Sequence, residues 1–285
     1  MVQISDYRQF KDVFQKTKQK FGTINSNCLL PNKVVSEALT ESSVYLEEYP
    51  EGFVMFTEWN APALFYKIYY FIGDINSFPK ISPEKPLLLE ELDVNGKRSE
   101  YLDQISASLN RSGFTEAAKN IMVETKCSDP TVSSETDKIL SHLESMNYRI
   151  EMDPHEVSTN DIADLWKNNL KKTDIPHEHY SSLKNGNSHI VCVFDPNNTV
   201  CGVNWWQYRN TVCEIRHTVT RADVRRKKIG SLMILFALDQ AYKNNCRTAY
   251  TYIDSNNTSS INMYEKAGFT KNGKVCKQFI LPMDI

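Results

Sequence analysis

The sequence predicts an α/β protein with a mixed sheet, built as two unequal domains, and three observations lead to this prediction. The chain has 285 residues, against about 150 for a typical single domain. Its C-terminal half has the pattern of several strands followed by alternating helices and strands, which is typical of a mixed sheet covered by helices. A short repeat, Leu109–Phe114 and Tyr264–Phe269, closes a predicted helix and precedes a predicted strand in each half.

Periodicity and turn residues predict the elements of the first half. We expect helices at 5–21, 32–41 and 98–111, and strands at 43–48, 52–58, 63–72, 86–91 and 116–125. Ser5 can cap the first helix and Gly22 can end it. The polar stretch 128–137 interrupts the pattern and is the expected linker. The first domain is therefore predicted at 1–130, followed by a linker or helix at 131–146.

The second domain is predicted at 147–285. Its expected strands are 147–152, 188–195, 199–208, 212–220, 247–253 and 275–282, and its expected helices are 158–170, 230–244 and 258–267. The turn sequence Asp195-Pro196-Asn197-Asn198 joins two of the strands. The helices between strands would cover the faces of the sheet.

Composition excludes several classes of protein. With 33 Lys and Arg against 35 Asp and Glu, the formal net charge is −2, so the chain lacks the positive field of a nucleic-acid-binding protein. The most apolar run, Ile229–Leu238, has about ten residues and is too short to span a bilayer. We therefore expect neither a nucleic-acid nor a membrane partner.

The cysteines and the N-terminus bear on metal binding and location. The seven cysteines form no C-x-x-C pair, and His177-Glu178-His179 has no nearby cysteine, so we expect no metal site. Scattered cysteines in apolar stretches are typical of buried side chains in a reducing compartment. Asp6 and Asp12 interrupt the charge of the amphipathic stretch 5–21, which favours a folded helix over a mitochondrial presequence. A cytoplasmic location is expected, and a mitochondrial one stays open.

Four cations precede the longest helix of the second half, in the stretch Arg225-Arg226-Lys227-Lys228-Ile229-Gly230-Ser231. A loop between a strand and a helix directs several backbone N–H groups to one point at the positive end of the helix dipole, a geometry that binds phosphate. Gly230 permits close approach of the backbone to an anion. The alternative is a solvated basic loop with no ligand.

A second group of residues surrounds the predicted helix 258–267. Asn257 can cap this helix and Gly268 can end it. Helical spacing places Asn257, Ser260 and Tyr264 on one face. The alternative is an ordinary helix whose Tyr264 is half-buried packing.

Together, the two stretches resemble the GNAT superfamily of N-acetyltransferases over residues 147–285. That superfamily has a pattern close to Arg-x-x-Gly-x-Gly/Ala at the head of a helix, then an Asn, a Tyr seven residues later, and Gly-Phe, as at Asn257, Tyr264 and Gly268-Phe269. One departure is Lys228, which stands where the first loop glycine is usual. Its N–H remains available to a ligand provided that its φ is negative.

A narrower resemblance, to the glycine N-acyltransferase-like family, rests on Glu214, which lies eleven residues before Arg225, and on Arg216. That family pairs a degenerate N-terminal copy of the fold with a working C-terminal copy, and Tyr66–Phe71 is similar to its first domain. Leu109 occupies the position equivalent to Tyr264, so the first copy is expected to lack the chemistry.

The resemblance implies an acyl-CoA cosubstrate and no metal. Backbone groups of Val219 and Thr220 would hold the pantetheine arm. Arg225 and the loop Arg226, Lys227, Lys228, Ile229, Gly230 and Ser231 would hold the pyrophosphate, with Asn257 and Ser260 nearby. Tyr264 would serve as the acid for the departing thiolate.

Acyl transfer to an amine also needs a base. Strand alternation would place Val212, Glu214, Arg216 and Thr218 on one face and His217 on the other. Glu214 is the preferred base and also the residue that the resemblance indicates. An ion pair with Arg216 is its structural alternative, and His217, redirected by a bulge, is the second candidate.

Trp205, Trp206 and Tyr208 could line an acyl or acceptor pocket, although core packing is the more common role of such residues. The leading hypothesis is an acyl-CoA-dependent N-acyltransferase acting on glycine or another small amine, as a monomer or homodimer. A general acetyltransferase for a polyamine, drug or protein amine, and a catalytically silent scaffold, are the alternatives.

Overall fold

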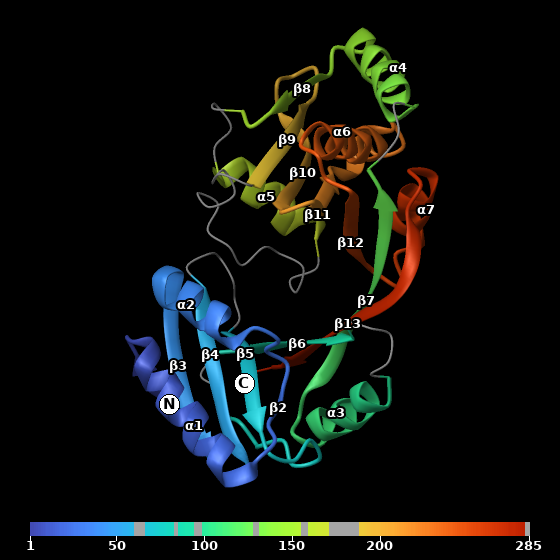
Figure 1. The fold of residues 1–285 in the computed structure, drawn as a ribbon. Coiled ribbons are helices and arrows are strands. Elements are labelled where there is room, and N and C mark those ends of the chain that lie inside the picture. Colours follow the sequence, from blue (N-terminus) through green and yellow to red (C-terminus); the bar gives the residue numbers. More distant parts are fainter. Residues whose placement is uncertain are drawn as a thin grey trace. The chain divides into compact units, whose positions relative to one another are not determined.

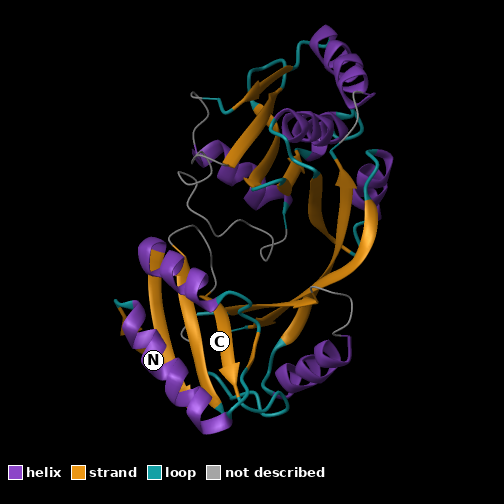
Figure 2. Ribbon diagram, in the orientation of Figure 1, coloured by secondary structure: helices purple, strands orange, loops and turns teal. Residues whose placement is uncertain are grey.

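The computed structural model describes residues 1–59, 66–82, 85–93, 99–127, 131–154, 159–170 and 188–282. The chain forms two compact units (Figures 1 and 2). The first unit comprises Met1–Asn120 and Gly273–Ile285, and the second comprises Ile121–Asn272. Each unit is a sheet with helices packed on it, so the predicted α/β class with a mixed sheet is confirmed.

The first unit has the strand order β1-β3-β4-β5-β6-β13, with the first half of β7 next to β13 and with β2 beside β5. All of these pairs whose register is known are antiparallel except β5 with β6, which is parallel. Its elements are β1 (Val2–Ile4), α1 (Tyr7–Phe21), β2 (Asn25–Ser26), α2 (Pro31–Glu41), β3 (Ser42–Tyr49), β4 (Gly52–Trp59), β5 (Tyr66–Ile72), β6 (Leu87–Asp93), α3 (Ser99–Arg111), and parts of β7 (Thr115–Lys126) and β13 (Thr270–Leu281).

Two hydrophobic clusters hold the first unit together. One joins α1 and α2 to β3, β4 and β5 and contains the stacked rings of Phe53 and Phe71, whose centroids are 4.6 Å apart. The other joins α3 to β5, β6 and β13 and contains Leu109, Phe114 and Phe279. Helices therefore cover the sheet on both faces, as alternation of apolar side chains along its strands requires.

The second unit has the strand order β7-β12-β11-β10-β9-β8. Strands β8 to β11 pair antiparallel and β11 pairs parallel with β12, which repeats the pattern of β3 to β6. Its elements are α4 (Thr131–Ser145), β8 (Arg149–Met152), α5 (Thr159–Asn169), β9 (Ser188–Phe194), β10 (Val200–Arg209), β11 (Val212–Thr220), the 3-10 turn η3 (Ala222–Val224), α6 (Ile229–Lys243), β12 (Thr248–Asp254) and α7 (Thr258–Lys266).

The sheet of the second unit separates two different cores. On one face, α4, α6 and α7 pack on Trp206, Cys213 and Ile215. On the other face, α5 packs on Trp205 and Val219. We call these the α6 face and the α5 face.

The helix ends that carry the sequence repeat have the same hydrogen bonds. The N–H of Phe114 donates to the carbonyl of Leu109 at 3.0 Å, and the N–H of Phe269 donates to that of Tyr264 at 3.0 Å. Gly113 and Gly268 both have positive φ, 93° and 87°, a conformation that favours glycine at a helix end. The repeat is therefore structural, and Leu109 is fully buried where the second copy has Tyr264.

The units differ from the predicted domain boundaries at two places. Residues 131–145 form helix α4, the helix allowed for in the predicted linker or helix at 131–146, but this helix packs on α6 inside the second unit. The last strand, predicted in the second domain, has Val275–Leu281 paired with β6 in the first unit. Sequence patterns cannot show this because the partner of a strand depends on residues far away in the chain.

Most predicted elements agree with the described residues. All predicted strands and helices are present, but the last strand begins at Thr270 instead of residue 275, and Asp6 instead of Ser5 caps α1, since the Asp6 side chain accepts from the Arg8 N–H. The short strands β1 and β2 were not predicted. All seven cysteines are buried, as expected. No helix in the described ranges is long and apolar enough to cross a membrane.

We expect Phe279→Ala to lower the free energy of unfolding by about 3–5 kcal/mol, because this ring on β13 is fully buried in the first unit. Denaturant unfolding monitored by circular dichroism measures the change. Lys271→Ala, at an exposed position of the same strand, is the matched control and should change it by less than about 0.5 kcal/mol. Equal effects of the two substitutions would contradict the placement of β13.

Candidate active site

The sheet of the second unit opens between β11 and β12. Val212–Glu214 pair in parallel with Thr248–Tyr250, and the ladder ends there although both strands continue. On the other side, β11 stays paired with β10 as far as Thr220. Among the described residues, one edge of β11 is therefore left without a strand partner over its last residues.

A β-bulge lies at the point where this pairing ends. Asn204 opposes Thr218 and Trp206 opposes Ile215, so Arg216 and His217 together face Trp205 alone. The predicted alternation of β11 is wrong at this point, because the extra residue reverses the faces beyond it. Both side chains of the bulge lie on the α5 face: Arg216 stacks over the Trp205 ring at 4.5 Å, and the His217 ring centroid is 5.6 Å from it.

Glu214 also faces the α5 side, opposite to its neighbours Cys213 and Ile215 in the core under α6. Its Oε2 lies 3.0 Å from Arg209 Nη2, and its Oε1 lies 3.6 Å from Arg216 Nε. The side chain is 15% exposed. The ion pair that was the structural alternative for Glu214 is therefore present, next to His217, the second candidate base.

Tyr264 lies on the α6 face and is 4% exposed. Its hydroxyl is 3.0 Å from Thr218 Oγ1. Burial raises the pKa of Tyr264 to about 12, against the opposing effect of the Thr218 and Thr251 hydroxyls. The phenol is thus protonated at neutral pH and can donate a hydrogen bond.

Strand alternation decides which backbone groups face the open edge of β11. The N–H of Arg221 donates to the Cys201 carbonyl at 2.8 Å, so the N–H and C=O groups of Arg221 face β10. Those of Val219, two residues earlier, face β10 as well, because backbone groups alternate along a strand. The backbone groups of Thr218 and Thr220 point to the open edge. This placement does not fit the role predicted for the Val219 backbone, whereas it fits the role predicted for Thr220.

The loop before α6 has an unusual backbone. Arg226 and Lys228 have positive φ, 68° and 63°, and Lys227 between them does not. Alternating signs of φ turn successive N–H groups toward one point, the arrangement of an anion-binding nest. The condition stated for Lys228, a negative φ, is not met: its φ is positive, the conformation that favours the glycine usual at this position.

The start of α6 supplies further donors to the same place. Lys228 provides no side-chain cap, and the first N–H groups of a helix, here those of Ile229, Gly230 and Ser231, have no partner within the helix. A Cβ on Gly230 would lie 2.8 Å from Met263 Sδ, so α6 approaches α7 closely there. The nest, the helix dipole and four exposed cations fit a pyrophosphate.

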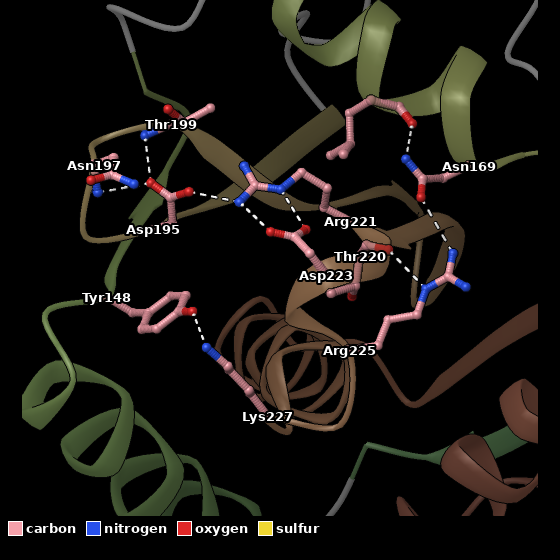
Figure 3. A network of polar contacts seen from close by, with 11 residues as sticks. Tyr148, Asn169, Asp195, Asn197, Thr199, Thr220, Arg221, Asp223, Arg225 and Lys227 are labelled. Carbon is pink, nitrogen blue, oxygen red and sulfur yellow. Dashed lines mark hydrogen bonds and ion pairs between the residues drawn. The ribbon is translucent and has the colours of Figure 1, made fainter.

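The four loop cations differ in their contacts, and Figure 3 shows those of Arg225 and Lys227. Arg225 donates to the Thr220 carbonyl at 3.3 Å and to Asn169 Oδ1 at 3.3 Å, which ties the loop to β11 and α5. Lys227 Nζ donates to the Tyr148 hydroxyl at 2.7 Å. Their side chains therefore support the loop, and the anion-binding role falls mainly on the backbone, with Arg226 and Lys228 exposed beside it.

Arg221 is a structural residue of the site that the sequence analysis missed. It donates to Asp195 Oδ2 at 2.7 Å and to both carboxylate oxygens of Asp223, joining the β9–β10 turn to η3 (Figure 3). Burial acts to raise the pKa of Asp195, but Arg221 and the N–H groups of Thr199 and Asn197 outweigh it, so this pKa is lowered. A positive and a negative charge two residues apart, at 221 and 223, were the sequence signal that could have indicated this ion pair.

Asn257 and Ser260 are joined by a hydrogen bond at the start of α7. Asn257 caps α7 as predicted, since its Oδ1 accepts from the Ser260 N–H at 3.1 Å. Tyr264 lies on the same helix and is buried, while Asn257 is exposed. The cap accounts for Asn257, and its contact with a cofactor stays a prediction.

The aromatic residues of β10 are core residues. Trp205 and Trp206 are fully buried on opposite faces of the sheet, so they line no common pocket. Tyr208 is partly buried against the core of the α6 face, and its hydroxyl accepts from Asn244 at 3.2 Å. A cavity of about 650 Å³ is lined by residues of β7, α4, α6, β12 and α7, and no predicted site residue lines it.

In the described ranges, no group of three or more His, Cys, Asp or Glu side chains could hold a metal ion. His177-Glu178-His179 lies outside the described residues.

Comparison with known families finds a match within the second unit. Residues 149–269 match the family model described as "Acetyltransferase (GNAT) family". The matched stretch contains Glu214, the loop 225–231 and Tyr264. A comparison with curated proteins finds no significant match.

Solved structures resemble the chain over nearly its whole length. A tandem GNAT protein from the clavulanic acid biosynthesis pathway has a TM-score of 0.58 and 10% identity, covering 98% of this chain and 97% of its own. A GCN5-related N-acetyltransferase from Kribbella flavida has a TM-score of 0.51 and 10% identity, covering 87% of this chain and 93% of its own. A GCN5-related N-acetyltransferase-like protein from Streptococcus suis has a TM-score of 0.51 and 12% identity, covering 94% of this chain and 98% of its own. These likenesses confirm the predicted tandem fold.

We expect Lys228→Gly to stabilise the protein by roughly 1 kcal/mol relative to Lys228→Ala, because only glycine adopts a φ of 63° without strain. Both substitutions remove the charge, so the comparison isolates the backbone. Thermal unfolding measures the difference. Equal stability of the two variants, or a less stable glycine variant, would count against the left-handed conformation.

Proposed function

We propose that this protein, whose residues 149–269 match the GNAT acetyltransferase family model, is an acyl-CoA-dependent N-acyltransferase for the amine of glycine or another small amine. The observation that carries the proposal is the anion-binding backbone of 226–231 next to the open edge of β11. A pyrophosphate bound there would allow the pantetheine arm to lie along Thr218 and Thr220. The thioester would then approach the Tyr264 hydroxyl.

The residues on the α5 face support an acceptor site. Arg216 and His217 lie beside the Trp205 ring, and Glu214 lies 3.6 Å from Arg216. In the proposed reaction, Glu214 takes a proton from the attacking amine, and Arg216 binds the carboxylate of an amino-acid acceptor. An arginine beside the base favours an amino acid over a polyamine, which carries only positive charge. The resemblance to the glycine N-acyltransferase-like family supports the same choice.

The step balances as a direct transfer. The amine nitrogen attacks the thioester carbonyl, the C–N bond forms and the C–S bond breaks. One amine proton passes to Glu214 and from there to solvent, and the departing thiolate, hydrogen-bonded by Tyr264, takes up one proton from solvent. The products are an amide and the thiol, with no oxidant or metal required.

We expect acetyl-CoA or a longer acyl-CoA to raise the melting temperature, since a ligand at 100 times its dissociation constant stabilises by about 2.7 kcal/mol. Ser231→Asp should abolish this rise, because its carboxylate repels the pyrophosphate at the α6 N-terminus while favouring the helix itself. Ser231→Asn is the uncharged control and should keep the rise. No shift with any acyl-CoA would contradict the proposed cofactor.

We expect Glu214→Gln to lower kcat by about 10²- to 10⁴-fold, the usual contribution of general base catalysis. Release of free thiol from acyl-CoA in the presence of glycine and a panel of amines measures turnover. Glu58→Gln, at a carboxylate of the first unit, is the control and should leave kcat unchanged. Binding of acyl-CoA without turnover by the unaltered protein would favour the catalytically silent scaffold.

A further inference from the structure

A chain of hydrogen bonds leads from the backbone of α6 to the Tyr264 hydroxyl. Asn204, fully buried on β10, donates from Nδ2 to the Met233 carbonyl at 3.0 Å. Its Oδ1 lies 3.2 Å from Thr218 Oγ1, which lies 3.0 Å from the Tyr264 hydroxyl oxygen. Asn204 and Thr218 oppose each other in the ladder, so both point to the α6 face.

The Met233 carbonyl determines which atom donates and which accepts in every hydrogen bond of this series. The Met233 carbonyl can only accept, so the Asn204 amide group faces it and the Asn204 Oδ1 faces Thr218. Thr218 has one hydroxyl proton and donates it to Oδ1. Its oxygen can then only accept from Tyr264, whose proton therefore points at Thr218.

We propose that Thr218, oriented by Asn204, is a positioning residue that supplies a switchable hydrogen bond to Tyr264 during acyl transfer. The inference rests on the proposed function. When Tyr264 turns its proton to the departing thiolate, the Thr218 hydroxyl rotates from Asn204 Oδ1 to the Tyr264 oxygen. No heavy atom has to move, and one hydrogen bond of Thr218 replaces another.

The chemistry of the leaving group explains why such a partner is needed. An ordinary thiol has a pKa of about 8.5, whereas burial raises the pKa of Tyr264 to about 12. A buried phenol therefore gives up its proton to a thiolate only in part, and the oxygen gains negative charge in a site that excludes water. An O–H donor directed at that oxygen stabilises the charge.

Thr218→Val removes the hydroxyl and nearly keeps the shape, and Thr218→Ser returns the hydroxyl. In steady-state kinetics we expect the valine variant to lower kcat by roughly 10- to 100-fold, the range for a hydrogen bond to a charged group. The KM for acyl-CoA should stay unchanged, and serine should restore most of the rate. Thr248→Val, the same exchange on β12, is the control and should leave kcat unchanged.

A double variant tests whether Thr218 acts through Tyr264. If it does, Tyr264→Phe combined with Thr218→Val is no slower than Tyr264→Phe alone, because the partner of the threonine is already absent. Multiplied losses, full activity of the valine variant, an inactive serine variant or a loss confined to KM would each overturn the inference and leave the proposed function standing. No turnover by the unaltered protein would overturn both.

Thermal unfolding of each variant shows whether it is folded. If the valine variant does not fold, Thr218→Ala and Thr218→Ser, which differ only in the hydroxyl, provide the same comparison. An alanine variant as fast as the serine variant would then overturn the inference.

Discussion

The β-bulge at Arg216 and His217 is the constraint on which the candidate active site depends. Its extra residue leaves Glu214 and both bulge side chains on the α5 face and turns Thr218 to the α6 face. In a regular strand, Thr218 would share a face with Glu214 and could not reach Tyr264. In the proposed reaction, the reacting carbonyl would lie at the open edge of β11, reached by Glu214 from one face and by Tyr264 with Thr218 from the other.

The same bulge accounts for the opening beside β11. A bulge bends and twists the strand that contains it, and the parallel ladder with β12 ends at Glu214, just before the bulge. The antiparallel ladder with β10 absorbs the extra residue and continues to Thr220. The open edge then leads directly to the loop of Arg225, whose contact with the Thr220 carbonyl fixes the loop to the end of the strand.

Local signals explain what the sequence could predict. The Asn257 cap, the glycine stops and the basic stretch before α6 depend on neighbouring residues, and each lies where the sequence placed it. The bulge has no such marker, because it is defined by the register against β10. The pairing of β13 with β6 and the ion pairs of Arg221 also depend on partners far away in the chain.

The two copies show why one hydroxyl matters. Leu109 and Tyr264 end their helices with the same backbone bonds and are both buried, so the fold requires only a large side chain at this position. A buried phenol is costly unless its hydroxyl is bonded, and in the second unit Thr218 provides that bond. The tyrosine, the threonine that bonds it and the bulge that turns the threonine inward form one interdependent group. Leu109 shows that packing alone does not need this group, whereas the proposed acyl transfer does.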